Sequence, residues 1–328
     1  MDFLRVRHIF ITILVVIVTA YSLVVLFSRG NMPRKPYITP SAIAFPFLFT
    51  ERTTTPQQPL DLPTLKHDAA ASLAPLSAFA YIGIYTAPDG QEHVLTEKGT
   101  SDEHLTASIT KLMTGLVASE IFEHSQEITI GKEAILQEGS SGKFLGGEKF
   151  SVDTLLRMLF IESNNDAAEA LALAYGRELF IRRMNEKARA LGLEHTWYGN
   201  PTGLDPDSET PANHSSARDI SRLLAHLYTS QPRLFAILGE KSYSVRDILS
   251  GKFYTATTTD QLLDDATLPL HILGGKTGTT TLAKKNLAVI TTSPNGKGFL
   301  VFVVLYSDDN FTDMKNLIEW ASSSFDWH

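Results

Sequence analysis

The stretch Thr106-Ala107-Ser108-Ile109-Thr110-Lys111-Leu112-Met113-Thr114 places a serine and a lysine three residues apart at the start of an apolar segment. On a helix this spacing brings both side chains to one face, within contact distance. A serine hydroxyl becomes a good nucleophile when a neighbouring base takes its proton. A neutral lysine can be that base where burial or another cation lowers its pKa from about 10.4. The stretch therefore predicts a nucleophile and its base in the first turn of a buried helix.

The residues after Lys111 make this helix apolar on most of its surface, as expected for a helix inside a domain. By itself, however, Ser-x-x-Lys is a weak signal. A serine near a helix N-terminus, followed by a lysine that extends along the surface, gives the same pattern. The rest of the chain has to decide between the two interpretations.

The composition limits the class of protein. The 328 residues suffice for one large domain or two ordinary ones, and a hydrophobic content of 43% allows a sizeable core. The net charge is −7 without a basic block, which argues against nucleic acid as a partner. There is no cysteine, so disulfides, thiolate metal sites and a cysteine nucleophile are excluded.

The first 68 residues predict a membrane anchor and a spacer. Residues 9–27 form an apolar run long enough to span a bilayer, without the small-x-small site of a cleaved signal peptide. The following stretch is rich in proline, and its apolar segment 42–49 either docks on a surface or belongs to a mobile tether. The expected organisation is a short cytoplasmic tail over 1–8, a transmembrane signal anchor over 9–27, a Pro-rich spacer over 28–68 and the main domain over 69–328.

The remaining chain alternates between strand and helix patterns in an order that defines the fold class. Residues 79–86 and 92–98 predict a hairpin, and a largely helical block follows over 132–228. We therefore expect an α/β (α+β) domain: an antiparallel sheet, completed by both ends of the domain and flanked by helices, with an inserted all-helical lobe. A cleft between sheet and lobe is a natural place for a site. The later strands are expected at 273–280, 287–292 and 299–306, the closing helix at 308–325, and helices of the block at 152–160, 165–175, 184–191 and 216–228, the last capped by Ser215 or Ser216.

Two further motifs fall where this architecture needs them. Ser163-Asn164-Asn165 lies at a turn into a helix of the lobe, and Lys276-Thr277-Gly278 lies on a strand of the sheet. Each motif alone is common as a turn, a cap or surface sequence. Ser-x-x-Lys, Ser-x-Asn and Lys-Thr-Gly in this order form the signature of penicillin-binding proteins and related β-lactamases. Chance is a poor explanation for all three together.

The sequence resembles the D-alanyl-D-alanine carboxypeptidases, which are low-molecular-weight penicillin-binding proteins of peptidase family S11. The similarity runs through Thr106–Gly115, Gly146–Ala172 and Ala190–Asp219 and covers most of residues 75–325. It implies a penicillin-binding protein/β-lactamase-like fold, preceded here by one transmembrane helix, in the bacterial cell membrane with the enzyme domain outside the cytoplasm. The implied partners are peptidoglycan stem peptides ending in D-Ala-D-Ala, and β-lactam antibiotics as covalent inhibitors.

The resemblance also implies a catalytic role for each residue of the first two motifs. Ser108 would attack the stem peptide to give an acyl-enzyme and free D-alanine, with Lys111 as its general base. Ser163 would relay a proton toward the leaving nitrogen. Asn165 would hold Lys111 or hydrogen-bond the substrate amide. Neither a metal nor any other cofactor is implied.

The third motif would bind the substrate. Lys276 and Thr277 would hold the terminal carboxylate, and Gly278 would let the strand approach the substrate backbone. The oxyanion would lie between the backbone N–H groups of Ser108 and Thr279.

The chain departs from the family pattern at three places. Thr279–Thr281 stands where the family often has an aromatic residue and then threonine, and Leu282–Asn286 lacks the usual glycine. Both changes fall on the substrate-side wall of the site. The second β-rich domain and amphipathic C-terminal anchor of many carboxypeptidases are missing, so we expect attachment through the N-terminal segment instead.

Other functions on this scaffold stay open. A D,D-endopeptidase would use the same residues. A β-lactamase needs fast deacylation, in one class through a loop glutamate that Asn200–Asp205 does not offer. A non-catalytic peptidoglycan-binding protein would be expected to have lost a motif residue. Arg218-Asp219 has two interpretations: an ion pair or cap in the first turn of a helix, or a contact to the substrate. His271 is interpreted as a packing residue.

Overall fold

The computed structural model describes residues 62–66, 73–137, 144–206, 212–247 and 249–328. The predicted tail and membrane anchor and most of the spacer lie outside these residues. Within the described part of the chain, no helix combines the length and the apolar character needed to cross a bilayer.

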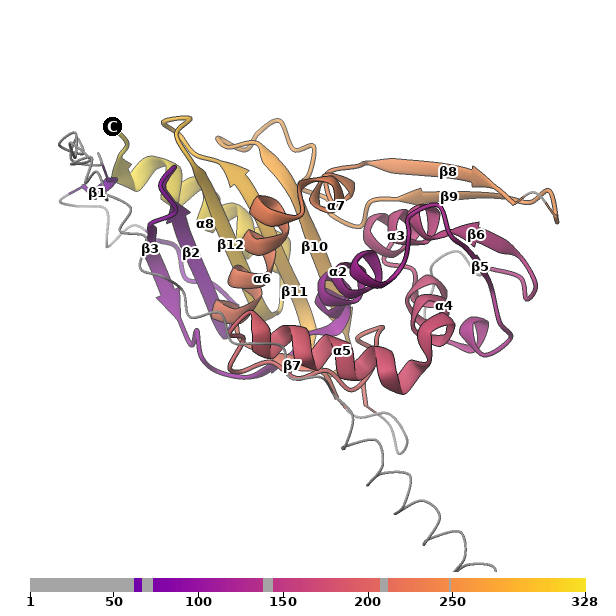
Figure 1. Ribbon diagram of the computed structural model, residues 1–328. Coiled ribbons are helices and arrows are strands. Elements are labelled where there is room, and N and C mark those ends of the chain that lie inside the picture. The colour runs from indigo at the N-terminus through magenta and orange to yellow at the C-terminus, as the bar shows by residue number, and fades with distance from the viewer. Residues whose placement is uncertain (1–61, 67–72, 138–143, 207–211, 248) are drawn as a thin grey trace, which may run out of the picture. The chain divides into compact units, whose positions relative to one another are not determined.

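The sheet is antiparallel and has the strand order β10-β11-β12-β2-β3 (Figure 1). The pairing of Ile82 with Val303 joins the first strand of the domain to the last strand of the sheet. Both ends of the domain therefore complete one sheet, as predicted. The strands are β2 (Ala80–Thr86), β3 (Glu92–Lys98), β10 (Ile272–Thr280), β11 (Lys284–Thr292) and β12 (Phe299–Ser307).

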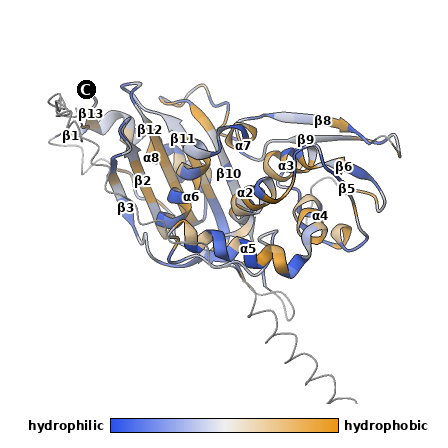
Figure 2. Cartoon of the chain, in the orientation of Figure 1, coloured by the Kyte–Doolittle hydropathy of each residue, from blue (hydrophilic) through white to orange (hydrophobic). Residues whose placement is uncertain are grey.

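Helices cover both faces of this sheet, so its central strand, β12, is apolar from Phe299 to Leu305 (Figure 2). Val301 and Val303 belong to the apolar cluster shared with the helices of one face, whereas Phe302 and Val304 belong to the cluster shared with the closing helix. The covering helices are α6 (Ala217–Ser230) on the first face and α8 (Asn310–Ser324) on the second, while α2 (Lys111–Ile121) packs against α6 and the helices of the lobe.

The inserted lobe contains the predicted helices and some unpredicted strands. Ser216 caps α6, since its side chain accepts a hydrogen bond from the Asp219 backbone N–H, 3.2 Å away. The hairpin of β8 (Ser242–Arg246) and β9 (Phe253–Thr257) was not predicted. The other elements of this part are β5 (Glu127–Thr129), η3 (Ala134–Leu136), β6 (Lys149–Ser151), α3 (Val152–Ile161), α4 (Asn165–Tyr175), α5 (Arg177–Ala190) and α7 (Pro232–Ile237).

The predicted first turn of the buried helix differs from expectation in one respect. Ser108 lies on a short 3-10 helix, η2 (Ala107–Thr110), and the α-helix α2 begins only at Lys111. Ala107 has φ +45°, a left-handed conformation that non-glycine residues adopt at a cost of about 1–3 kcal/mol. Two short strand pairs complete the fold: β1 (Thr64–Leu65) with β13 (Phe325–Asp326), and β4 (His104–Leu105) with β7 (His214–Ser215).

Candidate active site

The serine and lysine of the first motif are in direct contact. Lys111 Nζ lies 2.9 Å from Ser108 Oγ. The lysine side chain is fully buried, while the serine is partly exposed. The change from 3-10 to α-helix between the two residues therefore preserves the predicted contact.

Two other oxygens hold the Lys111 ammonium group. Nζ lies 2.7 Å from Asn165 Oδ1, at the start of α4, and 2.7 Å from the carbonyl oxygen of Thr202. Burial lowers the pKa of Lys111 well below its usual value, and the positive charge of Lys276 lowers it further. The site therefore favours the neutral amine that a general base requires.

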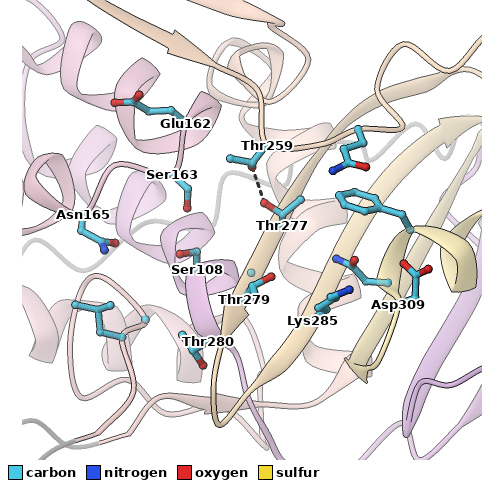
Figure 3. A pocket seen from close by; sticks show the side chains of 16 residues that line it. Ser108, Glu162, Ser163, Asn165, Thr259, Thr277, Thr279, Thr280, Lys285 and Asp309 are labelled. Carbon is cyan, nitrogen blue, oxygen red and sulfur yellow. Dashed lines mark hydrogen bonds between the residues drawn. The ribbon is translucent and has the colours of Figure 1, made fainter. Parts of the chain in front are cut away.

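The second motif forms a strained turn at the entrance to α4. Ser163 has φ +65°, and the Asn164 side chain caps the helix by accepting a hydrogen bond from Ala167 N–H at 2.8 Å. The cap fixes the turn, so that Ser163 and Asn165 point into the same cavity as Ser108 (Figure 3). Lys276 Nζ lies 3.0 Å from Ser163 Oγ, which joins the second motif to the third.

The third motif lies on β10, the edge strand beside η2. Lys276 is buried, and its Nζ also donates to the Thr277 carbonyl oxygen at 2.9 Å. Burial lowers the pKa of Lys276 to about 7, although the nearby carboxylate of Asp260 acts in the opposite direction. The hydroxyl groups of Thr277 and Thr259 form a hydrogen bond, with 2.5 Å between the two Oγ1 atoms (Figure 3).

The structure shows a steric requirement for glycine at position 278 that the sequence did not suggest. A Cβ atom at this position would lie 2.8 Å from the carbonyl oxygen of Thr106 and 3.0 Å from the backbone nitrogen of Ser108. The glycine thus lets β10 pack directly against the backbone of Thr106 and Ser108. The sequence predicted that the strand approaches the substrate backbone at Gly278. In this structure the close approach is to the backbone of Thr106 and Ser108.

A cavity of about 550 Å³ connects all three motifs. Such a volume is ordinary for a small-molecule site. Ser108, Ser163 and Asn165 line it from one side, and Thr277 and Thr279 from β10 (Figure 3). Lys111 and Lys276 lie beneath its wall. All eight predicted site residues thus line this cavity or contact a residue that lines it.

The loop Asn200–Asp205 has a role that sequence reasoning missed. Asn200 Oδ1 accepts hydrogen bonds from the backbone N–H groups of Thr202 and Gly203, at 3.1 and 2.7 Å. The buried Asn213 side chain in turn donates to the Asn200 carbonyl oxygen at 2.9 Å. This network presents the Thr202 carbonyl to Lys111. The Asn-Pro-Thr-Gly turn pattern was visible in the sequence, but a backbone carbonyl leaves no signal of its own.

Two other candidates have structural roles. The Arg218 guanidinium pairs with Glu97 at 2.7 Å, which confirms the ion-pair interpretation, and Asp219 accepts a hydrogen bond from His195 N–H at 2.7 Å. His271 is exposed, so its interpretation as a packing residue was wrong. Over the described residues, no group of three or more His, Cys, Asp or Glu side chains is placed to hold a metal ion.

Comparisons with known proteins agree with this geometry. A family model described as D-alanyl-D-alanine carboxypeptidase, peptidase family S11, matches residues 72–309. The carboxypeptidase DacD of Salmonella typhimurium is 32% identical over 282 residues, which cover 80% of this chain and 68% of that protein. DacC of Escherichia coli is 32% identical over 300 residues, covering 86% of this chain and 68% of the relative. For DacD of Escherichia coli the aligned region spans only 60% of the relative.

Two further similarities bear on the reaction and the fold. A D-alanyl-D-alanine endopeptidase of Escherichia coli is 30% identical over 227 residues, covering 66% of this chain and 69% of that protein. The crystal structure of penicillin-binding protein 6B from Escherichia coli superposes with a TM-score of 0.65 at 28% identity, covering 76% of this chain and 78% of that one.

Proposed function

The chain belongs to the S11 peptidase family of D-alanyl-D-alanine carboxypeptidases, and from that premise we propose that it removes the terminal D-alanine from peptidoglycan stem peptides. The observation that carries the proposal is the contact of a buried lysine with a partly exposed serine in a cavity that all three motifs share. A hydroxyl activated in this way attacks a carbonyl and forms an ester, which water then hydrolyses.

Acylation begins when the neutral Lys111 amine takes the proton of Ser108 Oγ across 2.9 Å. Asn165 Oδ1 and the Thr202 carbonyl hold Nζ in place for this transfer. The new oxyanion is received by the backbone N–H groups of Ser108 and Thr279. Ser163, joined to Lys276, passes a proton to the leaving nitrogen, so that D-alanine departs as the free amino acid.

The third motif holds the substrate's end. Thr277 presents its hydroxyl to the terminal carboxylate, and Lys276 behind it supplies positive potential. A β-lactam resembles an acylating substrate and is expected to leave a long-lived ester on Ser108.

The test of this proposal is the release of D-alanine from a diacyl-Lys-D-Ala-D-Ala peptide by the full chain in detergent. The Ser108→Ala variant is the control, and we expect it to release none. Release that persists in the variant would exclude Ser108 as the nucleophile. A folded wild-type protein that releases no D-alanine would refute the carboxypeptidase proposal.

The same assay can distinguish an endopeptidase. The 30% identity to a D-alanyl-D-alanine endopeptidase makes this the second candidate. A cross-linked dimer of stem peptides replaces the linear peptide, and the products are separated by chromatography. Faster cleavage of the dimer than of the linear peptide would favour the endopeptidase.

A third candidate, a β-lactamase, gains no support from the loop over Lys111. Asp205 is the only carboxylate among Asn200–Asp205, and it is held by the hydroxyl of Thr280 and by Leu282 N–H, 3.0 Å away. It therefore has no direct path to an ester on Ser108.

The pKa of Lys276 predicts an alkaline limit to activity. The proposed mechanism uses the charged form, and its pKa is about 7, so kcat/KM should fall by up to tenfold per pH unit above that value. The Lys276→Arg variant, which stays charged, should lose this decline even if it is slower. A wild-type kcat/KM that stays constant from pH 6 to 9 would contradict the assignment.

Stability should change with pH in the opposite sense. The folded-state pKa of Lys276 lies below the usual value of 10.5, so between about 7 and 10.5 the unfolded chain binds more protons. The free energy of unfolding should therefore rise with pH through this window, by a contribution that Lys276→Met removes.

We also propose that residues 9–27 anchor the protein in the bacterial cell membrane, with residues 69–328 outside the cytoplasm. The support is the apolar run itself and a substrate class found outside the cytoplasm. The full chain should stay with membranes through an alkaline carbonate wash, and a variant lacking residues 9–27 should not. Equal retention of both forms would refute the anchor.

A further inference from the structure

The cavity contains a basic side chain that none of the three motifs includes. Of the described residues that line the cavity, Lys285 is the only lysine, and there is no arginine or histidine among them. It stands on β11, directly opposite Thr279 of β10, and it is exposed. Cross-strand partners lie on the same face of a sheet, so Lys285 extends the row of side chains that begins with Thr277 and Thr279.

Lys276 is less suited to carry the main charge for an incoming anion. Its side chain is buried, its Nζ already contacts Ser163 Oγ and the Thr277 carbonyl, and its pKa of about 7 leaves only part of the molecules charged at neutral pH. A carboxypeptidase must distinguish a free carboxylate from an internal peptide bond. Lys285, which is exposed in the cavity, is better placed than Lys276 to make this distinction.

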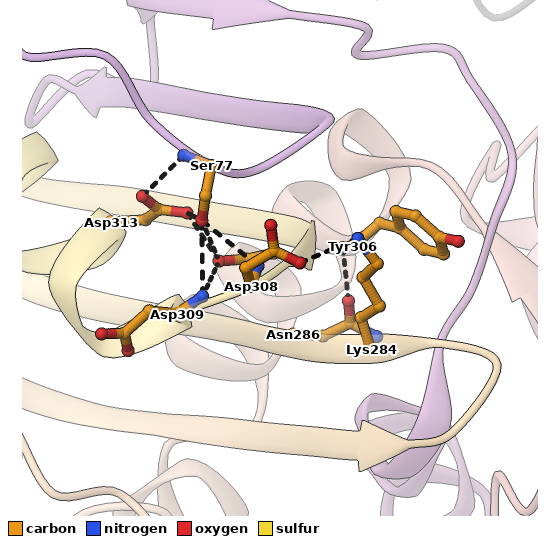
Figure 4. A network of polar contacts seen from close by, with 8 residues as sticks. Ser77, Lys284, Asn286, Tyr306, Asp308, Asp309 and Asp313 are labelled. Atoms are coloured by element: carbon orange, nitrogen blue, oxygen red, sulfur yellow. Dashed lines mark hydrogen bonds and ion pairs between the residues drawn. The ribbon is translucent and has the colours of Figure 1, made fainter.

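Polar contacts hold Lys284 and Asn286, the two neighbours of Lys285 on β11 (Figure 4). The neighbouring Asn286 accepts a hydrogen bond from Tyr306 N–H at 2.8 Å, and its carbonyl oxygen receives Asn310 Nδ2 at 2.9 Å. Lys284 turns away from the cavity to Asp308, 2.8 Å from its Nζ. Lys284 is thus held away from the cavity, whereas Lys285 lines it.

A carboxylate stands near Lys285 on the same wall. Asp309, just before α8, also lines the cavity (Figure 3). Its pKa is lowered mainly by a hydrogen bond from the Thr312 hydroxyl, with a smaller effect from the charge of Lys285. Asp309 therefore stays negative near neutral pH and limits how strongly this wall attracts anions.

Building on the proposed function, we infer that Lys285 binds the terminal carboxylate of the substrate and thereby makes the enzyme prefer free C-termini. Asp309 opposes this attraction and weakens it. The substrate carboxylate lies between Thr277 and Thr279 on one strand and Lys285 on the next.

The experiment compares two peptides, diacyl-Lys-D-Ala-D-Ala and the same peptide with a C-terminal carboxamide. For Lys285→Gln we expect kcat/KM on the free acid to fall about tenfold to a hundredfold, as for loss of a charge-assisted hydrogen bond. Its kcat/KM on the amide should stay within about twofold of wild type. Asp309→Asn, which keeps an oxygen for Thr312, should change the acid-to-amide ratio in the opposite direction.

Lys284→Gln is the matched control, because it removes the same charge one residue away from the cavity. It should leave the acid-to-amide ratio unchanged. A loss of rate in Lys285→Gln that is equal for both peptides, or an equal change in the ratio in Lys284→Gln, would overturn the inference.

Binding separates this inference from the proposed function. In a Ser108→Ala background, calorimetric titration should show tighter binding of the acid than of the amide, and Lys285→Gln should abolish that difference. If the wild type releases no D-alanine but the binding difference is found, the hydrolytic proposal fails and the role of Lys285 stands. If release occurs without the binding difference, only the inference about Lys285 fails.

Discussion

Replacing Lys111 with methionine is expected to slow acylation of Ser108 by at least about a thousandfold. A positioned general base contributes on the order of 10²–10⁴ to the rate of such a reaction. The Lys111 Nζ also contacts the Ser108 hydroxyl, 2.9 Å away, so the variant loses this contact as well. The rate can be followed by mass spectrometry as penicillin adds to the protein. Methionine fills the volume of the buried lysine stem, so the packing of α2 is retained.

The fold should survive this substitution. Asn165 Oδ1 and the Thr202 carbonyl lose a donor, at about 1–3 kcal/mol each, but a buried amine is removed at the same time. Thermal unfolding measures the net change in the free energy of unfolding. Lys241→Met at an exposed surface position is the matched control and should acylate like wild type. Acylation of folded Lys111→Met at the wild-type rate would remove Lys111 from the role of base.

The sequence predicted the sheet and the three motifs because both have strong local signals. Strands such as β12 are continuous apolar runs, and the lobe between the two halves of the sheet shows as a block of helical periodicity. The β8–β9 hairpin was missed because its strands show alternating burial over only five residues each. That is too short a pattern to stand out beside the helices around it.

The parts of the site that the sequence did not predict depend on backbone atoms, on tertiary packing and on the register between strands. The Thr202 carbonyl contacts Lys111 through an atom that every residue type possesses. The left-handed conformation of Ala107 comes from tertiary packing that overrides local preference. Lys285 joins the site only because β11 pairs with β10 in the observed register. The segment Leu282–Asn286, which lacks the glycine usual in the family, belongs to the same wall. Within this segment Lys284 adopts φ +52°, a left-handed conformation.

Substituting Gly203 with alanine is expected to destabilise the domain by about 3 kcal/mol or more. The new Cβ would lie 1.9 Å from the carbonyl oxygen of Ala107, and Gly203 has φ +83°. Left-handed strain costs about 1–2 kcal/mol, and overpacking adds about 1–3 kcal/mol. For a domain of this size the melting temperature should fall by about 6–12 °C.

The Gly296→Ala variant separates the effect of the steric clash from that of the backbone strain, because it introduces the strain without a clash. Gly296 has φ +66° on the turn after β11, but no atom lies within 4 Å of a Cβ placed there. It should therefore cost only the backbone strain, about 1–2 kcal/mol, and leave acylation by penicillin unchanged. Gly203→Ala must push the loop away from η2, so the Thr202 carbonyl withdraws from Lys111 and acylation slows as well. If both variants melt at the same temperature and acylate equally fast, the contact between this loop and η2 does not position the base.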